Sequence, residues 1–384
     1  MNVIGMMSGT SLDGQSIGYV RIDECPHPFV STFIAGEAYP FPDELRRDLF
    51  SLAGSGSVST ELVARSHRGL GRYADECLKR FLREKSLPRP DLVGFHGQTV
   101  FHQPSSGGTT TFQIGDPSPL AYDLGVPLVS DFRSMDTAAG GQGAPMVSAV
   151  DFLKYKSSDK TRFILNIGGI ANFTALPAGC SLSDVLAFDV GPGNILVDAI
   201  VDELTNHQLR YDDGGNIALS GHVSEQLIDA ILEADDYRTL PYPKTTGRER
   251  YGRLLVDSII SRGKTLALSN EDIIATATHY TAYMVSHHIK LLAGRGIIPD
   301  ELIVGGGGSR NRYLTKALEK DNPKVKLSFH DDYGVPSTFW ESYAFAVLAY
   351  LTYHGYTGNV ISATGASKEV ALGRINAPAK TKLG

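Results

Sequence analysis

Several short segments combine glycine with hydroxyl or carboxylate side chains, the residue types that surround phosphate groups. In the first, MSGTSLDG at 7–14, the candidate phosphate ligands are Ser8, Gly9, Thr10, Ser11 and Asp13. The N–H groups of a glycine turn and small hydroxyls form a concavity that binds anions, and Asp13 would hold the magnesium ion that phosphate sites usually require. The alternative is a polar hairpin tip built from ordinary turn residues. No Gly-Lys-Ser/Thr ending follows, so the segment is not a Walker A loop.

A second glycine segment is NIGGIAN at 166–172, which contains Gly168 and Gly169. Two glycines between apolar runs let a phosphate approach the backbone closely. Taken alone, a Gly-Gly hairpin turn is the better explanation. As the counterpart of 7–14, the segment predicts a second phosphate turn.

The third segment, FDVGPGN at 188–194, places Asp189 at the end of an apolar run. A rigid turn follows, with the candidate phosphate ligands Gly191, Gly193 and Asn194. In phosphoryl transfer a carboxylate accepts the proton of the attacking hydroxyl, which predicts Asp189 as the base. A helix starting near Gly193 would direct its N–H groups at the phosphate. The alternative is that Asp189 only caps that helix.

The remaining candidates are a glycine run and a set of polar residues at strand ends. Gly306 and Gly307 belong to GGGG at 305–308, between a predicted strand and a helix, where a flat ring or a ribose can lie on the backbone; a flexible loop is the alternative. Polar groups beside a Gly-rich turn suit hydrogen bonding to a sugar, and an arginine there can hold a carboxylate. Ordinary loop chemistry explains each of them equally. These predicted substrate residues are His96, Gln98, Thr99, Asp131, Arg133 and Gln142.

The elements that position these residues follow one order twice. Predicted strands at 2–7, 16–22 and 29–34 precede alternating helices and strands, and strands at 162–166, 170–176 and 185–188 begin the same order again. The pattern predicts an α/β fold of two lobes, with a nucleotide between them and a glycine turn from each lobe facing the phosphates. The expected lobes are 1–127 plus 360–384, and 128–359.

Composition excludes several classes of protein. A chain of 384 residues fits two domains, and a net charge of −6 with interspersed signs gives no footprint for nucleic acid or an anionic membrane. Three scattered cysteines argue against disulfides or a thiolate zinc site. No apolar run approaches the roughly 18 residues of a membrane span, and no basic-then-apolar leader is visible. We therefore expect a cytoplasmic protein.

Nine motifs in this order resemble the anhydro-N-acetylmuramic acid kinase family, a branch of the sugar kinase/heat-shock ATPase/actin superfamily. The resemblance spans nearly the whole chain. It implies a duplicated actin-like (ribonuclease H-like) sugar-kinase fold with an interdomain active-site cleft, ATP and Mg²⁺ as cofactors, and a homodimer. The motifs are MSGTSLDG (7–14), HGQT (96–99), QIGDP (113–117), DFR (131–133), AAGGQGAP (138–145), NIGGIANF (166–173), FDVGPGN (188–194), KTTGRE (244–249) and GGGG (305–308).

The resemblance also implies an unusual reaction of cell-wall sugar recycling. ATP phosphorylates O6 of 1,6-anhydro-N-acetylmuramic acid while water opens the 1,6-anhydro bridge, and the product is N-acetylmuramic acid 6-phosphate. Asp189 then activates water rather than a sugar hydroxyl. Glu341, next to Trp340, matches an acidic position near magnesium in the family.

One position departs from the family pattern. The first motif usually continues Asp-Gly-x-Asp, whereas here Gln15 is followed by Ser16. Two other functions therefore stay open: a kinase for another anhydro sugar such as levoglucosan, and a non-catalytic sugar or nucleotide sensor of the same fold. The turn at 138–145 resembles the muramic acid branch more than the levoglucosan branch.

Overall fold

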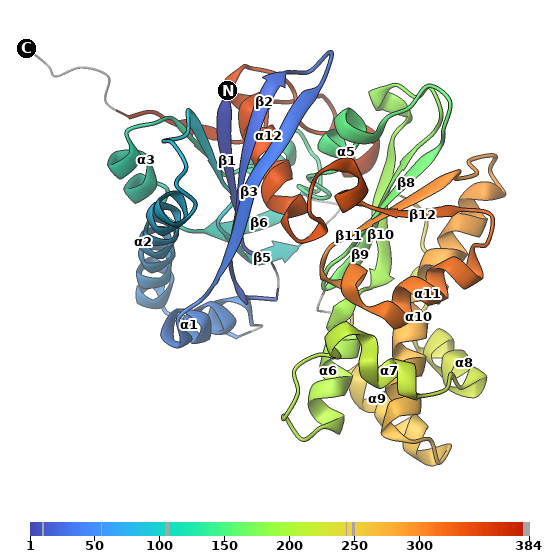
Figure 1. Cartoon of the computed structure of the whole chain (residues 1–384). Coiled ribbons are helices and arrows are strands. Elements are labelled where there is room, and N and C mark those ends of the chain that lie inside the picture. The colour runs from blue at the N-terminus through green and yellow to red at the C-terminus, as the bar shows by residue number, and fades with distance from the viewer. Residues whose placement is uncertain (10, 55, 104–107, 243, 248–249, 379–384) are drawn as a thin grey trace, which may run out of the picture. The chain divides into compact units, whose positions relative to one another are not determined.

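The computed structural model of the chain describes residues 1–9, 11–54, 56–103, 108–242, 244–247 and 250–378. It divides into two compact units, Met1–Lys154 with Gly334–Gly384, and Tyr155–Tyr333 (Figure 1). The expected boundaries at 127/128 and 359/360 do not coincide with this division. Residues 128–154 and 334–359 belong to the first unit, because a strand and a helix within them pack on its sheet.

The first unit is built on a mixed sheet with the strand order β13-β7-β4-β1-β2-β3. The strands β1, β2 and β3 form an antiparallel meander, whereas β4 and β7 run parallel to β1 and β13 closes the edge antiparallel to β7. A separate hairpin pairs β5 with β6. The bounds are β1 (Asn2–Met7), β2 (Gly14–Glu24), β3 (Val30–Pro40), β4 (Leu92–Phe95), β5 (Gln98–Gln103), β6 (Thr110–Ile114), β7 (Leu128–Ser130) and β13 (Arg374–Asn376).

Helices cover this sheet, and one of them lies unusually close to it. Helix α12 (Trp340–Tyr353) packs against β1, β2 and β4. A Cβ at Gly94 would lie 2.5 Å from the carbonyl oxygen of Phe345, and one at Gly5 would overlap the carbonyl of Ser342. Only glycine therefore allows this approach. The other helices of the unit are α1 (Asp43–Ala53), α2 (Thr60–Glu84), α3 (Ser118–Leu124), α4 (Ser134–Ala138), α5 (Ser148–Tyr155) and α13 (Ile361–Thr364).

The second unit repeats the plan with the strand order β10-β9-β8-β11-β12. Again three antiparallel strands come first, and two further strands run parallel to the first of them. The strands are β8 (Arg162–Ile167), β9 (Ile170–Leu176), β10 (Leu186–Pro192), β11 (Glu301–Gly305) and β12 (Lys326–Phe329). The helices are α6 (Asn194–Leu204), α7 (Asn216–Ser220), α8 (Glu225–Ala234), α9 (Arg253–Thr265), α10 (Asn270–Ala293) and α11 (Arg312–Asp321).

The shared order confirms the duplicated α/β fold. In each unit a meander of three strands is followed by parallel strands beside its first strand. The predicted strands at 2–7 and 170–176 have the observed bounds. The last long helix, α12, begins only at Trp340, because a short 3₁₀ turn, Ser337–Phe339, follows Pro336. Among the described residues, no helix has both the length and the apolar character of a membrane span.

Candidate active site

The turn between β1 and β2 carries the first predicted phosphate segment. Ser8 is buried, and its Oγ donates to the carbonyl of Gly97 at 3.1 Å, which joins this turn to the start of β5. Within the described residues, a Cβ at Gly9 would meet only Ser11 Oγ, at 3.8 Å. Packing among the described residues therefore does not require glycine at this position, whose carbonyl accepts the Leu12 N–H at 3.2 Å. Thr10 lies outside the described residues.

Three positions at the end of this turn, Asp13, Gln15 and Ser16, have different surroundings. The Asp13 side chain is 73% exposed, and its Oδ1 lies 3.7 Å from Nη2 of Arg46. The Gln15 side chain is fully buried and donates to the carbonyl of Met7 at 3.0 Å. Among the described residues, the buried Oγ of Ser16 has no hydrogen-bond partner. The position that departs from the family pattern thus holds an unpaired hydroxyl.

His96, at the end of β4, is held as a neutral imidazole. Its Nδ1 lies 2.9 Å from the carbonyl of Gly97, and Nε of Arg133 donates to its Nε2 at 3.2 Å. Since Nε2 accepts, the ring proton is on Nδ1. Burial first, and then the charge of Arg133, lower the pKa of His96 from 6.5 to about 3. Arg133 also donates to the carbonyl of Gly143 at 2.8 Å, so it links His96 to the Gly-rich turn.

Glu341 belongs to the same region, at the start of α12. Burial raises the pKa of its carboxyl group, and the charge of Arg133 opposes that rise. One turn further along the helix, the ring of Phe345 lies 4.6 Å from that of His96. The family resemblance, rather than the local sequence, predicted Glu341, and the structure places it in the field of a predicted substrate residue.

A buried carboxylate that the sequence analysis missed holds the turn at 138–145. Asp136 is fully buried; its Oδ2 accepts the Gly143 N–H at 2.8 Å, and its Oδ1 accepts from Asn359 Nδ2 at 2.9 Å and Thr364 Oγ1 at 2.8 Å. A Cβ at Gly141 would overlap this carboxylate. No local signal marks Asp136, because two of its partners lie more than 220 residues away.

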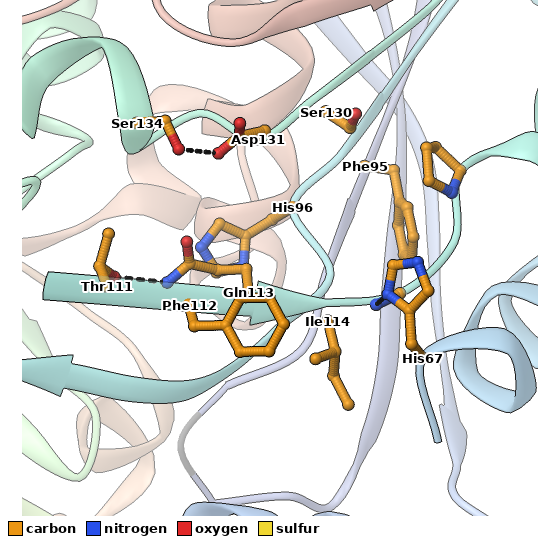
Figure 2. A pocket seen from close by; sticks show the side chains of 12 residues that line it. His67, Phe95, His96, Thr111, Phe112, Gln113, Ile114, Ser130, Asp131 and Ser134 are labelled. Carbon is orange, nitrogen blue, oxygen red and sulfur yellow. Dashed lines mark hydrogen bonds between the residues drawn. The ribbon is translucent and has the colours of Figure 1, made fainter. Parts of the chain in front are cut away.

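A cavity of about 230 Å³ opens beside His96 in the first unit (Figure 2). Asp131 lies on its wall with a φ of 56°, and its carboxylate accepts from Ser134 Oγ and pairs with Arg374 at 2.9 Å. The cavity thus brings together two predicted substrate residues, His96 and Asp131. Its wall also contains His67, Phe95, Thr111, Phe112, Gln113, Ile114, Gly115, Pro117, Ser130 and Ser134.

Four predicted substrate residues, including Arg133, do not line that cavity. Gln98 is buried at the start of β5, and its Nε2 donates to the carbonyl of Thr99 at 3.1 Å. Thr99 Oγ1 accepts from Gln113 Nε2 at 3.3 Å. The backbone N–H of Gln142 donates to the Thr364 carbonyl at 2.8 Å. Gln113 was missed as a site residue, although the motif at 113–117 contains it.

In the second unit, the β8–β9 turn packs against the start of α6. The N–H groups of Gly193 and Ile195 donate to the Gly169 carbonyl at 2.9 and 3.1 Å, and that of Asn194 donates to the Gly168 carbonyl at 2.8 Å. The expectation that the N–H groups beginning at Gly193 point at a phosphate is therefore wrong for these three. They bind the neighbouring turn instead, which fixes the two glycine segments to each other.

The run of four glycines joins the same group of turns. Gly306 has a φ of 77°, and a Cβ there would lie 2.6 Å from both Asn166 Oδ1 and the Ile167 carbonyl oxygen. A Cβ at Gly307 would lie 3.5 Å from Asn194 Nδ2. Among the described residues, Asn166 Oδ1 is buried without a hydrogen-bond partner. The segments at 166–169, 193–194 and 305–308 thus converge at the ends of β8 and β11.

Asp189 lies on β10, where the pairing with β9 shifts register before Gly191. Its N–H donates to the Lys244 carbonyl at 3.0 Å, its carbonyl accepts from Tyr237 Oη at 2.9 Å, and its Oδ2 accepts the Thr246 N–H at 2.9 Å. Helix α6 has Gly193 at its N-cap and no side-chain cap. The alternative that Asp189 caps this helix is therefore wrong.

A hollow of about 440 Å³ lies beside the 245–246 segment, and Asp189 is not among the described residues of its wall. Thr246, whose N–H holds Asp189, belongs to its wall. The motif at 244–249 thus contacts Asp189 through its backbone. Arg248 and Glu249 of the motif lie outside the described residues. The other residues of the wall are Tyr237, Leu240, Thr245 and Arg250.

Two sheets of ribonuclease H-like strand order, each with glycine turns at its strand ends, define an actin-like α/β protein. The model of the anhydro-N-acetylmuramic acid kinase family matches residues 1–378. The anhydro-N-acetylmuramic acid kinase of Caldanaerobacter subterraneus subsp. tengcongensis is 35% identical, over 97% of this chain and 96% of that protein. That of Bacillus cereus (strain B4264) is 38% identical, over 98% and 97%. The chain belongs to the anhydro-N-acetylmuramic acid kinase family.

Family membership makes the protein an ATP-using kinase, a phosphotransferase with an alcohol group as acceptor. A ROK family glucokinase from Streptomyces griseus in complex with glucose and AMPPNP is 12% identical, with a TM-score of 0.39 over 91% of this chain and 99% of that chain.

Proposed function

We propose that this protein converts 1,6-anhydro-N-acetylmuramic acid and ATP into N-acetylmuramic acid 6-phosphate and ADP. Membership of the family supports the substrate. The observation that carries the mechanism is the fixed carboxylate of Asp189, whose Oδ2 accepts the N–H of Thr246, a residue that lines a hollow, at 2.9 Å.

In the proposed reaction, the oxygen of a water molecule attacks C1 of the sugar and the C1–O6 bond breaks. Asp189 accepts the proton of the water, and O6 takes the γ-phosphoryl group as ADP leaves. A positioned carboxylate contributes about 10²–10⁴-fold to such a step. Most of the remaining acceleration comes from orientation and from neutralising the phosphate charge.

The nucleotide phosphates are proposed to bind the glycine turns. In the first unit these are Ser8, Gly9, Thr10 and Ser11; in the second they are Gly168, Gly169, Gly191, Gly306 and Gly307. Gly193 and Asn194 are left out, because their N–H groups donate to the neighbouring turn. The open space where a Cβ at Gly9 would lie supports the first turn. The unpaired Asn166 Oδ1 beside Gly306 is an acceptor that a ribose hydroxyl would satisfy.

The chemistry of the carboxylates fits a magnesium ion. Mg²⁺ prefers carboxylate oxygens and is usually held by one or two of them plus phosphates. Asp13 presents an exposed carboxylate on the first turn, and we propose it as a ligand together with Glu341. When bound, the ion would neutralise phosphate charge. It would also favour the ionised form of Glu341, which burial opposes.

The sugar is proposed to contact the polar residues of the first unit. His96 and Asp131 line the cavity there, Gln98, Thr99 and Gln142 lie on neighbouring segments, and Arg133 is the candidate partner of the lactyl carboxylate. A homodimer in the cytoplasm completes the proposal and rests on the family resemblance.

The test is a substrate screen with product identification. MgATP with the anhydromuramic sugar, levoglucosan or glucose is compared by kcat/KM, and the reaction is run in ¹⁸O water. We expect the muramic sugar to be preferred and its product to carry ¹⁸O at C1. An unlabelled product would overturn the ring-opening mechanism, and preference for levoglucosan would overturn the substrate.

A further inference from the structure

Lys244 is a buried cation whose segment surrounds Asp189. The residue is 5% exposed, and its carbonyl accepts the Asp189 N–H at 3.0 Å. Two residues later, the Thr246 N–H donates to Asp189 Oδ2. The Lys244 backbone therefore holds one side of the carboxylate-bearing residue, while Thr246 holds the carboxylate itself.

The ammonium group of Lys244 anchors this segment to the interior. Its Nζ donates to the Tyr237 carbonyl at 2.8 Å and lies 3.3 Å from His288 Nε2. It also lies over the Tyr237 ring, 4.3 Å from the centroid. Tyr237 in turn donates its hydroxyl to the Asp189 carbonyl. Tyr237 thus contacts both the ammonium group of Lys244 and the backbone of Asp189.

The imidazole of His288 is suited to receive this cation. Its Nδ1 lies 2.7 Å from Tyr242 Oη, and burial followed by the charge of Lys244 lowers its pKa to about 3. A neutral ring that donates from Nδ1 leaves Nε2 as an acceptor for an ammonium.

Two negatively charged groups, Asp235 and Asp189, act on the ammonium group of Lys244. Burial lowers the pKa of Lys244 from 10.5 to about 8, while Asp235 and Asp189 oppose that fall. Asp235 is already paired with Arg250 at 2.9 Å. The other titratable groups facing this region are Tyr237, Tyr242, Asp236, His287, His288 and Arg295.

We propose that Lys244 is a positioning residue of the kinase reaction. Its buried ammonium fixes the 244–246 segment that orients the Asp189 carboxylate, and its positive charge acts on that carboxylate. This inference rests on the proposed role of Asp189 as the base, and it names a residue that acts on the base without touching the substrate.

The first experiment compares Lys244→Met with Lys244→Arg, which keeps the charge, and with the control Lys154→Met in the other unit. We expect Lys244→Met to lower kcat about tenfold or more, while the Kd for ATP changes less than twofold. The acid limb of the kcat/KM profile should move to higher pH by about half a unit or more. Lys244→Arg should return the acid limb of this profile to its wild-type pH. A folded Lys244→Met protein with an unmoved acid limb overturns the proposal, whatever else is observed.

A reciprocal measurement does not depend on the folding of Lys244→Met or on turnover. The ¹³C resonance of the Lys244 ε-carbon is titrated in the wild-type protein and in Asp189→Asn. Because coupling between two sites is mutual, we expect the Lys244 titration to move to lower pH in Asp189→Asn. An unchanged titration overturns the proposal. Turnover by Asp189→Asn would instead overturn the proposed function and leave this coupling standing.

Discussion

Nε of Arg133 donates to Nε2 of His96 at 3.2 Å, so a permanent cation is hydrogen-bonded to a buried neutral imidazole. The same guanidinium reaches the Gly143 carbonyl. Arg133→Met would leave both acceptors without this donor, and we expect the sugar KM to rise about tenfold or more, since a lost bond to a charged group costs about 1.5–3 kcal/mol. Steady-state kinetics check this, with the KM for ATP as the internal control. An unchanged sugar KM would remove Arg133 from the substrate site.

The neutral histidines make stability depend on pH. The pKa values of His96 and His288 fall from 6.5 to about 3 in the folded protein, so the unfolded chain binds more protons below pH 6.5. Stability is therefore lost as pH falls through this window, by about 1.4 kcal/mol per pH unit for each histidine. Urea unfolding between pH 7 and 5 measures the slope. His96→Gln should remove one histidine's share, and an unaltered slope would contradict this account.

Asp189→Asn removes the proposed base while keeping an acceptor oxygen for the Thr246 N–H. We expect kcat to fall about 10²–10⁴-fold with little change in the melting temperature. Asp202→Asn, on an exposed carboxylate of α6, is the matched control and should keep full activity. Near-normal turnover by Asp189→Asn would place the base elsewhere.

Asp136→Ala should both destabilise the first unit and loosen its Gly-rich turn. The change leaves the buried Gly143 N–H and Asn359 amide without their acceptor. Because each unsatisfied buried donor costs about 1–3 kcal/mol, we expect the unfolding free energy to fall by several kcal/mol. Thr364→Val deletes a single bond to the same carboxylate and should cost about 1 kcal/mol. Equal losses of unfolding free energy in the two variants would argue against Asp136 as the common acceptor that holds this turn.

The buried carboxylate of Glu301 offers a second test of pH-dependent stability, in the second unit. Its carboxylate accepts from Lys326, Ser328, Tyr333 and Arg162, and these donors outweigh burial and lower its pKa to about 2. The stability that this gives is present above about pH 4.5 and is lost as pH falls towards 2. We expect Glu301→Gln to reduce the acid sensitivity measured between pH 4.5 and 3. Lys326→Met removes the largest of these contributions and should reduce the acid sensitivity in part, since the lysine is largely exposed and its charge is screened by solvent.

Local sequence patterns predicted the meanders, because alternation and turn residues act over a few neighbours. They placed Asp189 at the end of a strand, whereas it lies inside β10, which continues to Pro192. They missed β12 and β13, which are short and mostly not buried. They also missed Asp136, whose partners come from the other end of the chain. The N–H groups of α6 were predicted to face a ligand, since nothing local shows that the β8–β9 turn occupies them.

The close contact of α12 with Gly5 and Gly94 limits how the substrate range of this enzyme can change. The helix that carries Glu341 and Phe345 is almost wholly interior, so a substitution chosen to reshape the sugar site from this side also changes the packing of the sheet. The β5–β6 hairpin forms its own small sheet, and its Phe101 and Phe112 are about half exposed. Selection or design for a different sugar can vary the hairpin with less loss of stability, which makes it the more evolvable wall of the site.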